Sequence, residues 1–427
     1  MQMNIKGLIY LAFITAFSVF VYVTDLSQLY RLGGYRNELV KNDSAVNPTT
    51  NGIITLGRKR AYARRTKMGE CVPKFGRIMV LVVMDNQSIK KGNYAVAQRS
   101  LDCYLSSTNY TFKRVAFDED ERVKKLCMKY KKVYFQKHCI ASAYLPDTDW
   151  MLVLDADTGV VNPNHCIEQW IDDRVDLIFY ERFFNWEIAS GNYLVKNTPF
   201  ARKFLLDFAD WEFNPVKWPL DNGPLQLLIL KTVLPDAKIE IKACTNYWNK
   251  SLGYASLMAF TTCVRTALGA QRIWPQKLRI LRRAHGFCRD GWLTDDAFAD
   301  IDFMFHGWKA LNLGGPWKSP FEKMPNVSEC RAGDFSGWNW RKDKQISVEE
   351  VGKRLSEMEK KCAKDFPQAA RVHAHLSEPD VAECYPNCDE LYLTTVSTNS
   401  NKYSRIRSNK CCCYSNSCRE FYSNFIN

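Results

Sequence analysis

The chain has 427 residues, of which 46% are hydrophobic and 25% are charged, and its formal net charge is +13. Most of the excess lies near the two ends, with nine basic and four acidic residues in 25–70 and five basic and one acidic in 401–427. About +3 is left for the large middle of the chain, which argues against nucleic-acid binding there.

The first distinctive segment is an apolar run near the N-terminus. Residues Gly7–Val23 carry no charge over 17 residues, which is the short end of what spans a bilayer as a helix. We therefore expect a cytosolic stub (1–6), a signal-anchor transmembrane helix (7–24) and a solvated basic stem (25–70). A cleaved signal peptide is the alternative, although no small-x-small pattern follows the run. Both interpretations put the rest of the chain in the secretory lumen or outside the cell.

The next part of the chain alternates between predicted strands and helices. From 71 to 344 it provides about 270 residues, enough for one large α/β domain. Strands are predicted at 78–83, 111–117 and 150–154, with helices at 94–105 and 137–144. This order predicts a parallel sheet with crossover helices, in which ligands bind at the carboxyl ends of the strands.

A pair of carboxylates, Asp155-Ala156-Asp157, follows the apolar run Trp150–Leu154 directly. Five consecutive apolar residues are typical of a strand that is buried on both faces, so the pair would emerge at the carboxyl edge of the sheet. Two carboxylates one residue apart suit Mg²⁺ or Mn²⁺, which they would share with a diphosphate. Asp85 follows the first strand and would lie on the same edge, where it either caps a helix or binds a nucleotide.

Two later segments carry candidate polar groups. Ser190-Gly191-Asn192 is a predicted turn, in which Gly permits close backbone approach and Asn offers both a donor and an acceptor to hydroxyl groups. Thr198 is the predicted cap of a helix whose aromatic stripe we assign to the core. Asp221 and Asn222 precede a Leu-rich helix, so Asp221 is either a helix cap or a catalytic residue.

The C-terminal part divides into a helix and a tail. Residues 345–380 are predicted to be helical and to pack on the core through one apolar face. The residues of that face are Val348, Val351, Leu355, Met358 and Cys362. The tail, 381–427, is rich in cysteine and would form either a small disulfide-stapled lobe or a partly disordered end.

Cysteines and glycosylation sequons both indicate an oxidising compartment. The chain has 16 cysteines without the paired spacing of a zinc site, which favours disulfides. Five Asn-x-Ser/Thr sequons agree with a lumenal chain. They begin at Asn42, Asn86, Asn109, Asn249 and Asn326.

The order of these motifs resembles that of the fungal galactosyl- and mannosyltransferases of the GMA12/MNN10 type and their plant xylosyltransferase relatives. The chain is most similar to a nematode-expanded, DUF273-like family of unassigned function. The matching pieces are Phe135-Gln136-Lys137, Asp155-Ala156-Asp157, Ser190 to Asn197, Asp221-Asn222 and His306-Gly307-Trp308-Lys309. The chain departs from the pattern at Asn222, where those enzymes carry Gln, and over 244–290, which has no counterpart.

The resemblance implies a GT-A fold, a Rossmann-like α/β domain that binds a nucleotide-sugar and a divalent metal, Mn²⁺ or Mg²⁺. It implies glycosyl transfer with retention at the anomeric carbon. Asp157 and His306 would then ligate the metal, and Asp155 would ligate it or hold the ribose. His285 is the alternative candidate for the metal-binding histidine.

The resemblance also implies roles for four further residues. Lys309 would add positive charge near the diphosphate. Lys137 would pair with the site carboxylates or simply cover a helix face. Asp221 and Asn192 would steady the sugar and its hydroxyls rather than attack it.

The implied donor is UDP-galactose, with UDP-glucose, UDP-xylose and GDP-mannose behind it, and the implied acceptor is a glycan on protein or lipid. The expected location is the Golgi membrane, as a single-pass type II protein, with secretion as the alternative.

Two rival classes of function remain. One is a catalytically silent relative that binds glycans. The other is a cysteine-rich extracellular module that binds structural Ca²⁺, although the loops that Ca²⁺ prefers are not evident around Asp155.

Overall fold

The computed structural model describes residues 71–183, 185–214, 221–284, 286–309, 319–331 and 335–365. The predicted anchor, the basic stem, the cysteine-rich tail and His285 lie outside the described residues. Within those ranges, no helix combines the length and the apolar character that crossing a membrane requires.

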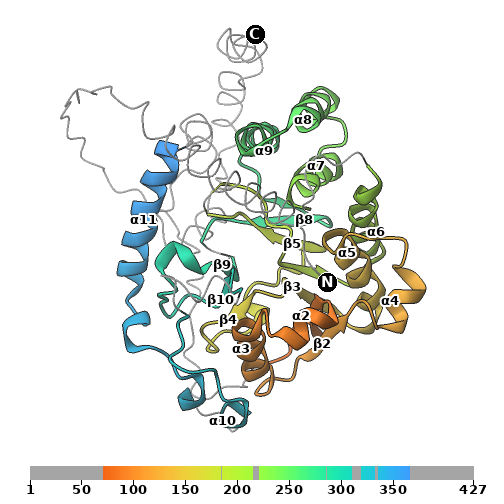
Figure 1. The fold of residues 1–427 in the computed structure, drawn as a ribbon. Coiled ribbons are helices and arrows are strands. Elements are labelled where there is room, and N and C mark those ends of the chain that lie inside the picture. Colours follow the sequence, from red (N-terminus) through yellow and green to blue (C-terminus); the bar gives the residue numbers. More distant parts are fainter. Residues whose placement is uncertain are drawn as a thin grey trace, which may run out of the picture. The chain divides into compact units, whose positions relative to one another are not determined.

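A seven-stranded mixed sheet in the order β2-β1-β3-β6-β5-β8-β7 forms the centre of the fold (Figure 1). β1 pairs in parallel with both β2 and β3, which confirms the parallel arrangement predicted for the first three strands. β6 is antiparallel to β3 and β5, β8 is parallel to β5, and β7 is antiparallel to β8. The strands are β1 (Ile78–Met84), β2 (Thr111–Ala116), β3 (Trp150–Leu154), β5 (Leu177–Tyr180), β6 (Tyr193–Lys196), β7 (Ile273–Trp274) and β8 (Leu278–Leu281).

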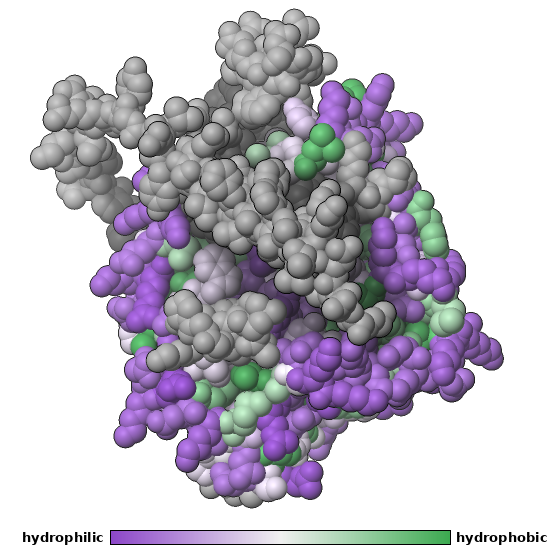
Figure 2. Space-filling view, in the orientation of Figure 1, coloured by the Kyte–Doolittle hydropathy of each residue, from purple (hydrophilic) through white to green (hydrophobic). Residues whose placement is uncertain are grey.

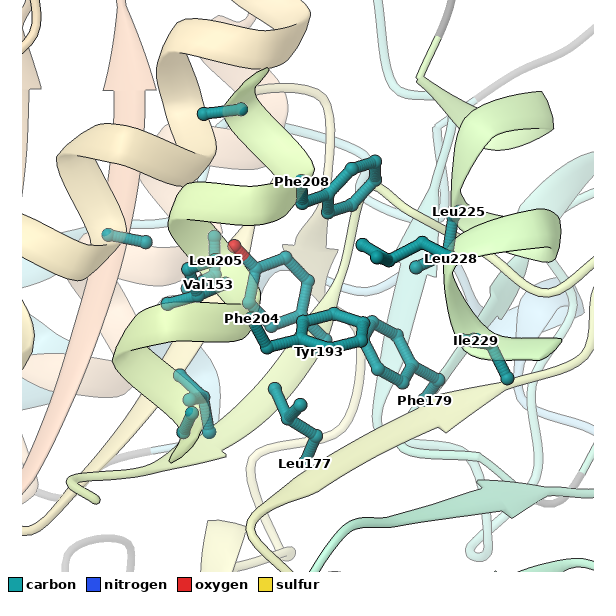
Figure 3. Close-up of a cluster of buried hydrophobic side chains, with 14 of the residues drawn as sticks. Val153, Leu177, Phe179, Tyr193, Phe204, Leu205, Phe208, Leu225, Leu228 and Ile229 are labelled. Carbon is teal, nitrogen blue, oxygen red and sulfur yellow. The ribbon is translucent and has the colours of Figure 1, made fainter. Parts of the chain in front are cut away.

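The central strands are buried on both faces because their side chains alternate between two apolar layers. Every residue of β1 and β3 is buried. Along β1, Met79, Leu81 and Val83 enter one cluster, while the residues between them enter the other. Figure 3 shows the first cluster, where aromatic residues of α6 meet leucines of α7 above the sheet. The continuous apolar runs of the sequence therefore do form doubly covered strands.

Helices cover both faces of the sheet. The helices that precede β3 are α2 (Asn86–Lys91), α3 (Ala95–Leu105), α4 (Glu121–Leu126) and α5 (Val133–Tyr144). Those that follow it are α6 (Pro199–Asp210), α7 (Asn222–Val233), α8 (Lys238–Lys250), α9 (Tyr254–Leu268), α10 (Val327–Arg331) and α11 (Val348–Asp365). Thr198 caps α6 as predicted, because its hydroxyl accepts a hydrogen bond from the Ala201 amide at 3.1 Å. Phe204, Leu205 and Phe208 of that helix are core residues, as expected.

A second, three-stranded sheet in the order β4-β10-β9 lies beside the first (Figure 1). Its strands are β4 (Gly159–Val160), β9 (Cys288–Asp290) and β10 (Met304–His306). β10 is antiparallel to β4 and parallel to β9, and His306 is paired in register with Asp290. The small sheet therefore brings the late histidine next to the turn that follows β3.

Four disulfides tie distant parts of the domain together: Cys71–Cys166, Cys103–Cys330, Cys127–Cys139 and Cys244–Cys263. They confirm the prediction of disulfides for these eight cysteines. Cys244–Cys263 joins α8 to α9, inside the segment 244–290 that could not be placed from sequence. Among the cysteines whose side chains the structure describes, Cys288 is buried without a disulfide partner.

The described part of the face seen in Figure 2 is largely hydrophilic. On the face seen in Figure 2, apolar side chains form small, separate patches among charged ones. The apolar face predicted for the C-terminal helix is directed inwards in α11, where Val351 and Leu355 are buried against Phe183, Leu293 and Ala299. The apolar face of α11 therefore packs against the domain.

Candidate active site

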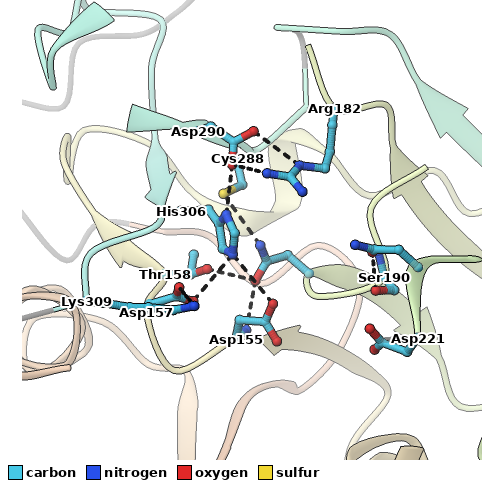
Figure 4. A network of polar contacts seen from close by, with 12 residues as sticks. Asp155, Asp157, Thr158, Arg182, Ser190, Asp221, Cys288, Asp290, His306 and Lys309 are labelled. Carbon is cyan, nitrogen blue, oxygen red and sulfur yellow. Dashed lines mark hydrogen bonds and ion pairs between the residues drawn. The ribbon is translucent and has the colours of Figure 1, made fainter. Parts of the chain in front are cut away.

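Two carboxylates and an imidazole meet at the carboxyl edge of the central sheet. Asp155 and Asp157 lie in the turn after β3, and His306 ends β10. One ligand atom from each of these residues lies within 4.8 Å of the others. His306 Nε2 is 3.4 Å from Asp157 Oδ1 and 3.7 Å from Asp155 Oδ2 (Figure 4). The three residues expected to bind a metal are therefore brought together.

The donor set of this cluster fits a divalent cation. Carboxylate oxygens and one imidazole nitrogen suit Mn²⁺ or Mg²⁺, and the separations allow one ion to reach all three groups. Burial disfavours the charged imidazolium, but the carboxylates of Asp157 and Asp290 outweigh it and raise the pKa of His306 to about 9. A proton and a metal ion would thus compete for His306.

The loop after β10 is hydrogen-bonded to the turn after β3. The backbone N–H groups of Gly307 and Trp308 donate to the Asp157 carbonyl oxygen at 3.2 and 2.9 Å. Gly307 adopts a φ of 105°, which favours glycine at this point of the loop. Lys309 follows and its Nζ lies 3.6 Å from Asp157 Oδ2, with half of the side chain exposed. Lys309 thus lies beside Asp157 with access to solvent, and its predicted place near a diphosphate stays a prediction.

Asn192 braces the turn that carries the two carboxylates. Its Oδ1 accepts hydrogen bonds from the Asp155 amide at 2.9 Å and from the Thr158 hydroxyl at 3.0 Å. Its Nδ2 donates to the Tyr180 hydroxyl at 3.0 Å, and the side chain is buried. Both ends of its amide are thus bonded within the protein, and the expected contact of Asn192 with sugar hydroxyls stays a prediction. Next to it, a Cβ on Gly191 would overlap the Asp155 carboxylate, which is why this turn needs glycine.

Lys137 bridges two of the predicted site carboxylates from a buried position in α5. Its Nζ lies 2.9 Å from Asp155 Oδ1 and 3.4 Å from Asp221 Oδ2. Of the two predictions for Lys137, the pairing with site carboxylates is the one that the structure shows. Its part in binding a cofactor would then be indirect.

Asp221 begins the element that becomes α7 and is also buried. Within the described residues its carboxylate makes no helix-capping bond, so capping does not explain its presence. Instead its Oδ2 lies 3.1 Å from His138 Nε2 and also faces Lys137. Burial opposes the charge of Asp221, but Lys137 and His138 hold its pKa below the usual range. The carboxylate is thus a neutralised anion beside the site, poorly suited to attack a substrate.

Asp85 is a helix cap. Its Oδ1 accepts a hydrogen bond from the Ser88 amide at 2.7 Å at the start of α2, and this contact lowers its pKa. Of the two predictions for Asp85, capping is therefore the one shown.

Tyr94 is a residue that sequence reasoning missed. It is half-buried, and burial together with the charge of Asp157 raises its pKa.

The sequence reasoning also missed the residues behind His306. Asp290 Oδ1 lies 2.8 Å from His306 Nδ1, and Arg182 donates to both oxygens of Asp290. Arg182 lies two residues after the end of β5, at the same edge of the sheet as the two aspartates, so its position after an apolar strand was an available signal. Asp290 carried no comparable signal, because its strand has three residues.

The fold and the site define a mixed α/β domain with an acidic and histidine-bearing cluster at the carboxyl edge of its sheet. The chain belongs to the family described as "Protein of unknown function, DUF273", whose model matches residues 101–319. This match confirms the DUF273-like resemblance, and the likeness to the GMA12/MNN10 type stays a proposal. No curated protein matches the chain.

One solved structure with some similarity is a glycosyltransferase involved in the glycosylation of the major capsid of PBCV-1. It is 18% identical, and the match covers 38% of this chain and 78% of that chain with a TM-score of 0.26. A likeness of this size carries no argument about the activity of this chain.

Proposed function

We propose that this protein is a metal-dependent glycosyltransferase that moves a hexose from a nucleotide-sugar to a glycan acceptor. The observation that carries the proposal is the convergence of Asp155, Asp157 and His306 within 4.8 Å at one sheet edge. Two carboxylates and a histidine in such a place suit a cation that also binds a diphosphate.

The sheet topology supports the same proposal. From β1 the chain passes to β2 on one side, and then returns to β3 on the other. In open α/β sheets, ligands bind outside the carboxyl ends of the strands where the order reverses in this way. Asp155 and Asp157 follow β3 at that point. A GT-A type domain, with its donor over this edge, is the form of the proposal that agrees with the strand order.

In the proposed reaction, Asp157 and His306 would hold the metal, and Asp155 would complete the set. When bound, the ion would neutralise negative charge on the departing diphosphate. Lys309, half-exposed beside Asp157, would add positive charge near the same phosphates. Lys137 keeps Asp155 ionised and oriented, because its ammonium group is 2.9 Å from that carboxylate.

The bond changes can be written without a protein nucleophile. The bond between the anomeric carbon and the diphosphate oxygen breaks, and its electron pair leaves with the diphosphate. The acceptor hydroxyl oxygen bonds to the same carbon, and its proton passes to the leaving diphosphate. Asp221, which was expected to take part directly, would act through its negative charge behind Lys137, since the Lys137 ammonium group and the His138 imidazole already contact its carboxylate. Retention at the anomeric carbon belongs to this proposal.

We propose UDP-galactose as the first donor to test, followed by UDP-glucose, UDP-xylose and GDP-mannose. The proposed acceptor is a glycan on protein or lipid, and the proposed location is the Golgi membrane through residues 7–24, with secretion as the alternative. The four disulfides support an oxidising compartment.

The test is donor hydrolysis by the purified full-length chain, with each nucleotide-sugar in the presence and absence of Mn²⁺. We expect Mn²⁺-dependent release of nucleotide from one donor, abolished in the double variant Asp155→Ala/Asp157→Ala. The matched control is Asp236→Ala, which removes an exposed carboxylate between α7 and α8.

Two other outcomes have defined meanings. Mn²⁺-dependent nucleotide binding without turnover on any donor, repeated with glycan acceptors added, would favour a silent, glycan-binding relative. Neither turnover nor nucleotide binding by a folded protein would refute the proposed function.

A further inference from the structure

His306 is held between two kinds of carboxylate (Figure 4). Its Nε2 faces the cluster formed by Asp155 and Asp157, and its Nδ1 lies 2.8 Å from Oδ1 of Asp290. An ionised carboxylate can only accept a hydrogen bond, so Nδ1, which is at hydrogen-bonding distance from Asp290, carries a proton. In the neutral imidazole this leaves the lone pair on Nε2, which is the nitrogen that faces the two aspartates.

Asp290 is fixed in place by both its strand and a cation. It ends β9 and is the register partner of His306 on β10, so the two residues are direct neighbours on adjacent strands. From the other side, Arg182 Nη2 donates to Oδ1 at 2.9 Å and Nε donates to Oδ2 at 3.2 Å. A two-pronged contact of this kind restrains the plane of a carboxylate as well as its position. Asp290 is buried, so little solvent competes for it.

The Asp290 carboxylate is itself badly placed to bind the ion. The cluster of Asp155, Asp157 and His306, whose ligand atoms lie within 4.8 Å of one another, does not include Asp290. The oxygens of Asp290 are already occupied by the Nδ1 proton and by the guanidinium of Arg182. Among the described residues, the Asp290 side chain contacts the cluster through the imidazole ring of His306.

We propose that Asp290, held by Arg182, is a positioning residue that sets the tautomer and ring orientation of His306 so that Nε2 is presented to a divalent cation. The inference rests on the proposed function, because it assumes that the cluster binds a metal. Hydrogen-bond partners of metal-binding histidines act in this way, and their loss typically costs about 10- to 100-fold in metal affinity.

The experiment is a double-mutant cycle on Mn²⁺ affinity, measured by calorimetry with the full-length protein and without any sugar donor. Asp290→Ala should weaken Mn²⁺ binding about 10- to 100-fold. In a His306→Ala background the same change should have an effect of less than about 3-fold, because the residue through which it acts is gone. Asp290→Asn keeps an acceptor for Nδ1–H and should recover most of the affinity lost in Asp290→Ala.

A matched control separates positioning from general stability. Asp302 is another buried aspartate of the same region, and it pairs with Arg289 at 2.7 Å instead of with the histidine. Asp302→Ala should lower the thermal unfolding midpoint but leave the Mn²⁺ affinity unchanged. Unfolding midpoints without metal identify any variant that does not fold, and Asp290→Asn is the variant closest in shape to the native residue.

Three results would overturn the inference. If Asp290→Ala leaves Mn²⁺ affinity unchanged while the unaltered protein binds Mn²⁺, the positioning role fails and the proposed function stands. If Asp290→Ala weakens binding equally with and without His306, the carboxylate does not act through the imidazole. If the unaltered protein binds no Mn²⁺, the metal-dependent function fails and takes the positioning role with it.

Discussion

The ammonium group of Lys137 lies 2.9 Å from the Asp155 carboxylate, and only 7% of the lysine side chain is exposed. Lys137 of α5 thus balances the charge of Asp155, the first acid of the Asp-x-Asp motif, from a buried position. The exposed lysine of the site, Lys309, faces the other acid at 3.6 Å from the solvent side. The two lysines carry the same charge but differ in burial, so we expect their replacement to change the stability of the domain by different amounts.

Replacing the buried lysine should destabilise the domain. Lys137→Met leaves Asp155 and Asp221 without their shared cation, so the free energy of unfolding should fall by about 3 kcal/mol or more. Lys309→Met removes a half-exposed partner and should change it by less than about 1 kcal/mol. Urea unfolding of both variants, followed by tryptophan fluorescence, provides the comparison. Equal, small losses would show that the buried ion pair contributes little.

Metal binding should depend steeply on pH. The pKa of His306 is raised to about 9, so at neutral pH the imidazole carries a proton that the metal must displace. Apparent Mn²⁺ affinity should therefore rise by about 10-fold for each pH unit between 6.5 and 8.5. Calorimetry across that range measures the slope. The slope should be lost in His306→Gln, and a flat profile in the unaltered protein would contradict the prediction.

Acid should destabilise the domain through His138. Burial is the main cause that lowers the pKa of His138 from 6.5 to about 4, despite the nearby Asp221. Between pH 6.5 and about 4, His138 is protonated in the unfolded chain but not in the folded one. The free energy of unfolding therefore has its full value above pH 6.5 and falls as the pH drops towards 4. The loss is about 3 kcal/mol at most. Unfolding free energies measured at several pH values should fall less steeply in His138→Gln, and an unchanged slope would assign the effect elsewhere.

The turn before β6 should tolerate no side chain at its glycine. In Gly191→Ala the new Cβ would overlap the Asp155 carboxylate and push it away from the cluster. We expect Mn²⁺ affinity to fall by at least about 10-fold, the size of the effect of disturbing the groups that support a metal site. Gly253→Ala is the matched control, because a Cβ there meets nothing within 4 Å. Equal affinities in the two variants would mean that Asp155 has room to move.

The sequence alone predicted those features that depend on local pattern. The apolar runs before Asp85 and Asp155 predicted buried parallel strands, because a strand covered on both faces has no polar period. Thr198 followed by Pro199 predicted the start of a helix for an equally local reason. The grouping of Asp155, Asp157 and His306 was predicted from a resemblance in the order of motifs.

Other features depend on contacts between distant segments, and no spacing in the chain encodes them. The amide of Asn192 was predicted to contact sugar hydroxyls, and its hydrogen bonds to the turn after β3 could not be read from the sequence. Asp221 resembles a helix cap, yet its partners are Lys137 and His138 of α5.

The kinds of residue at the sheet edge, two carboxylates after a buried strand, could be read directly from the chain, because strand burial follows from consecutive apolar residues. The tertiary structure determined which other side chains contact these groups. The register between β9 and β10 brings Asp290 behind His306, and Arg182, which follows β5 of the large sheet, contacts Asp290 from its other side. Neither contact follows from the local pattern, because Asp290 is 16 positions from His306 and 108 positions from Arg182 in the chain.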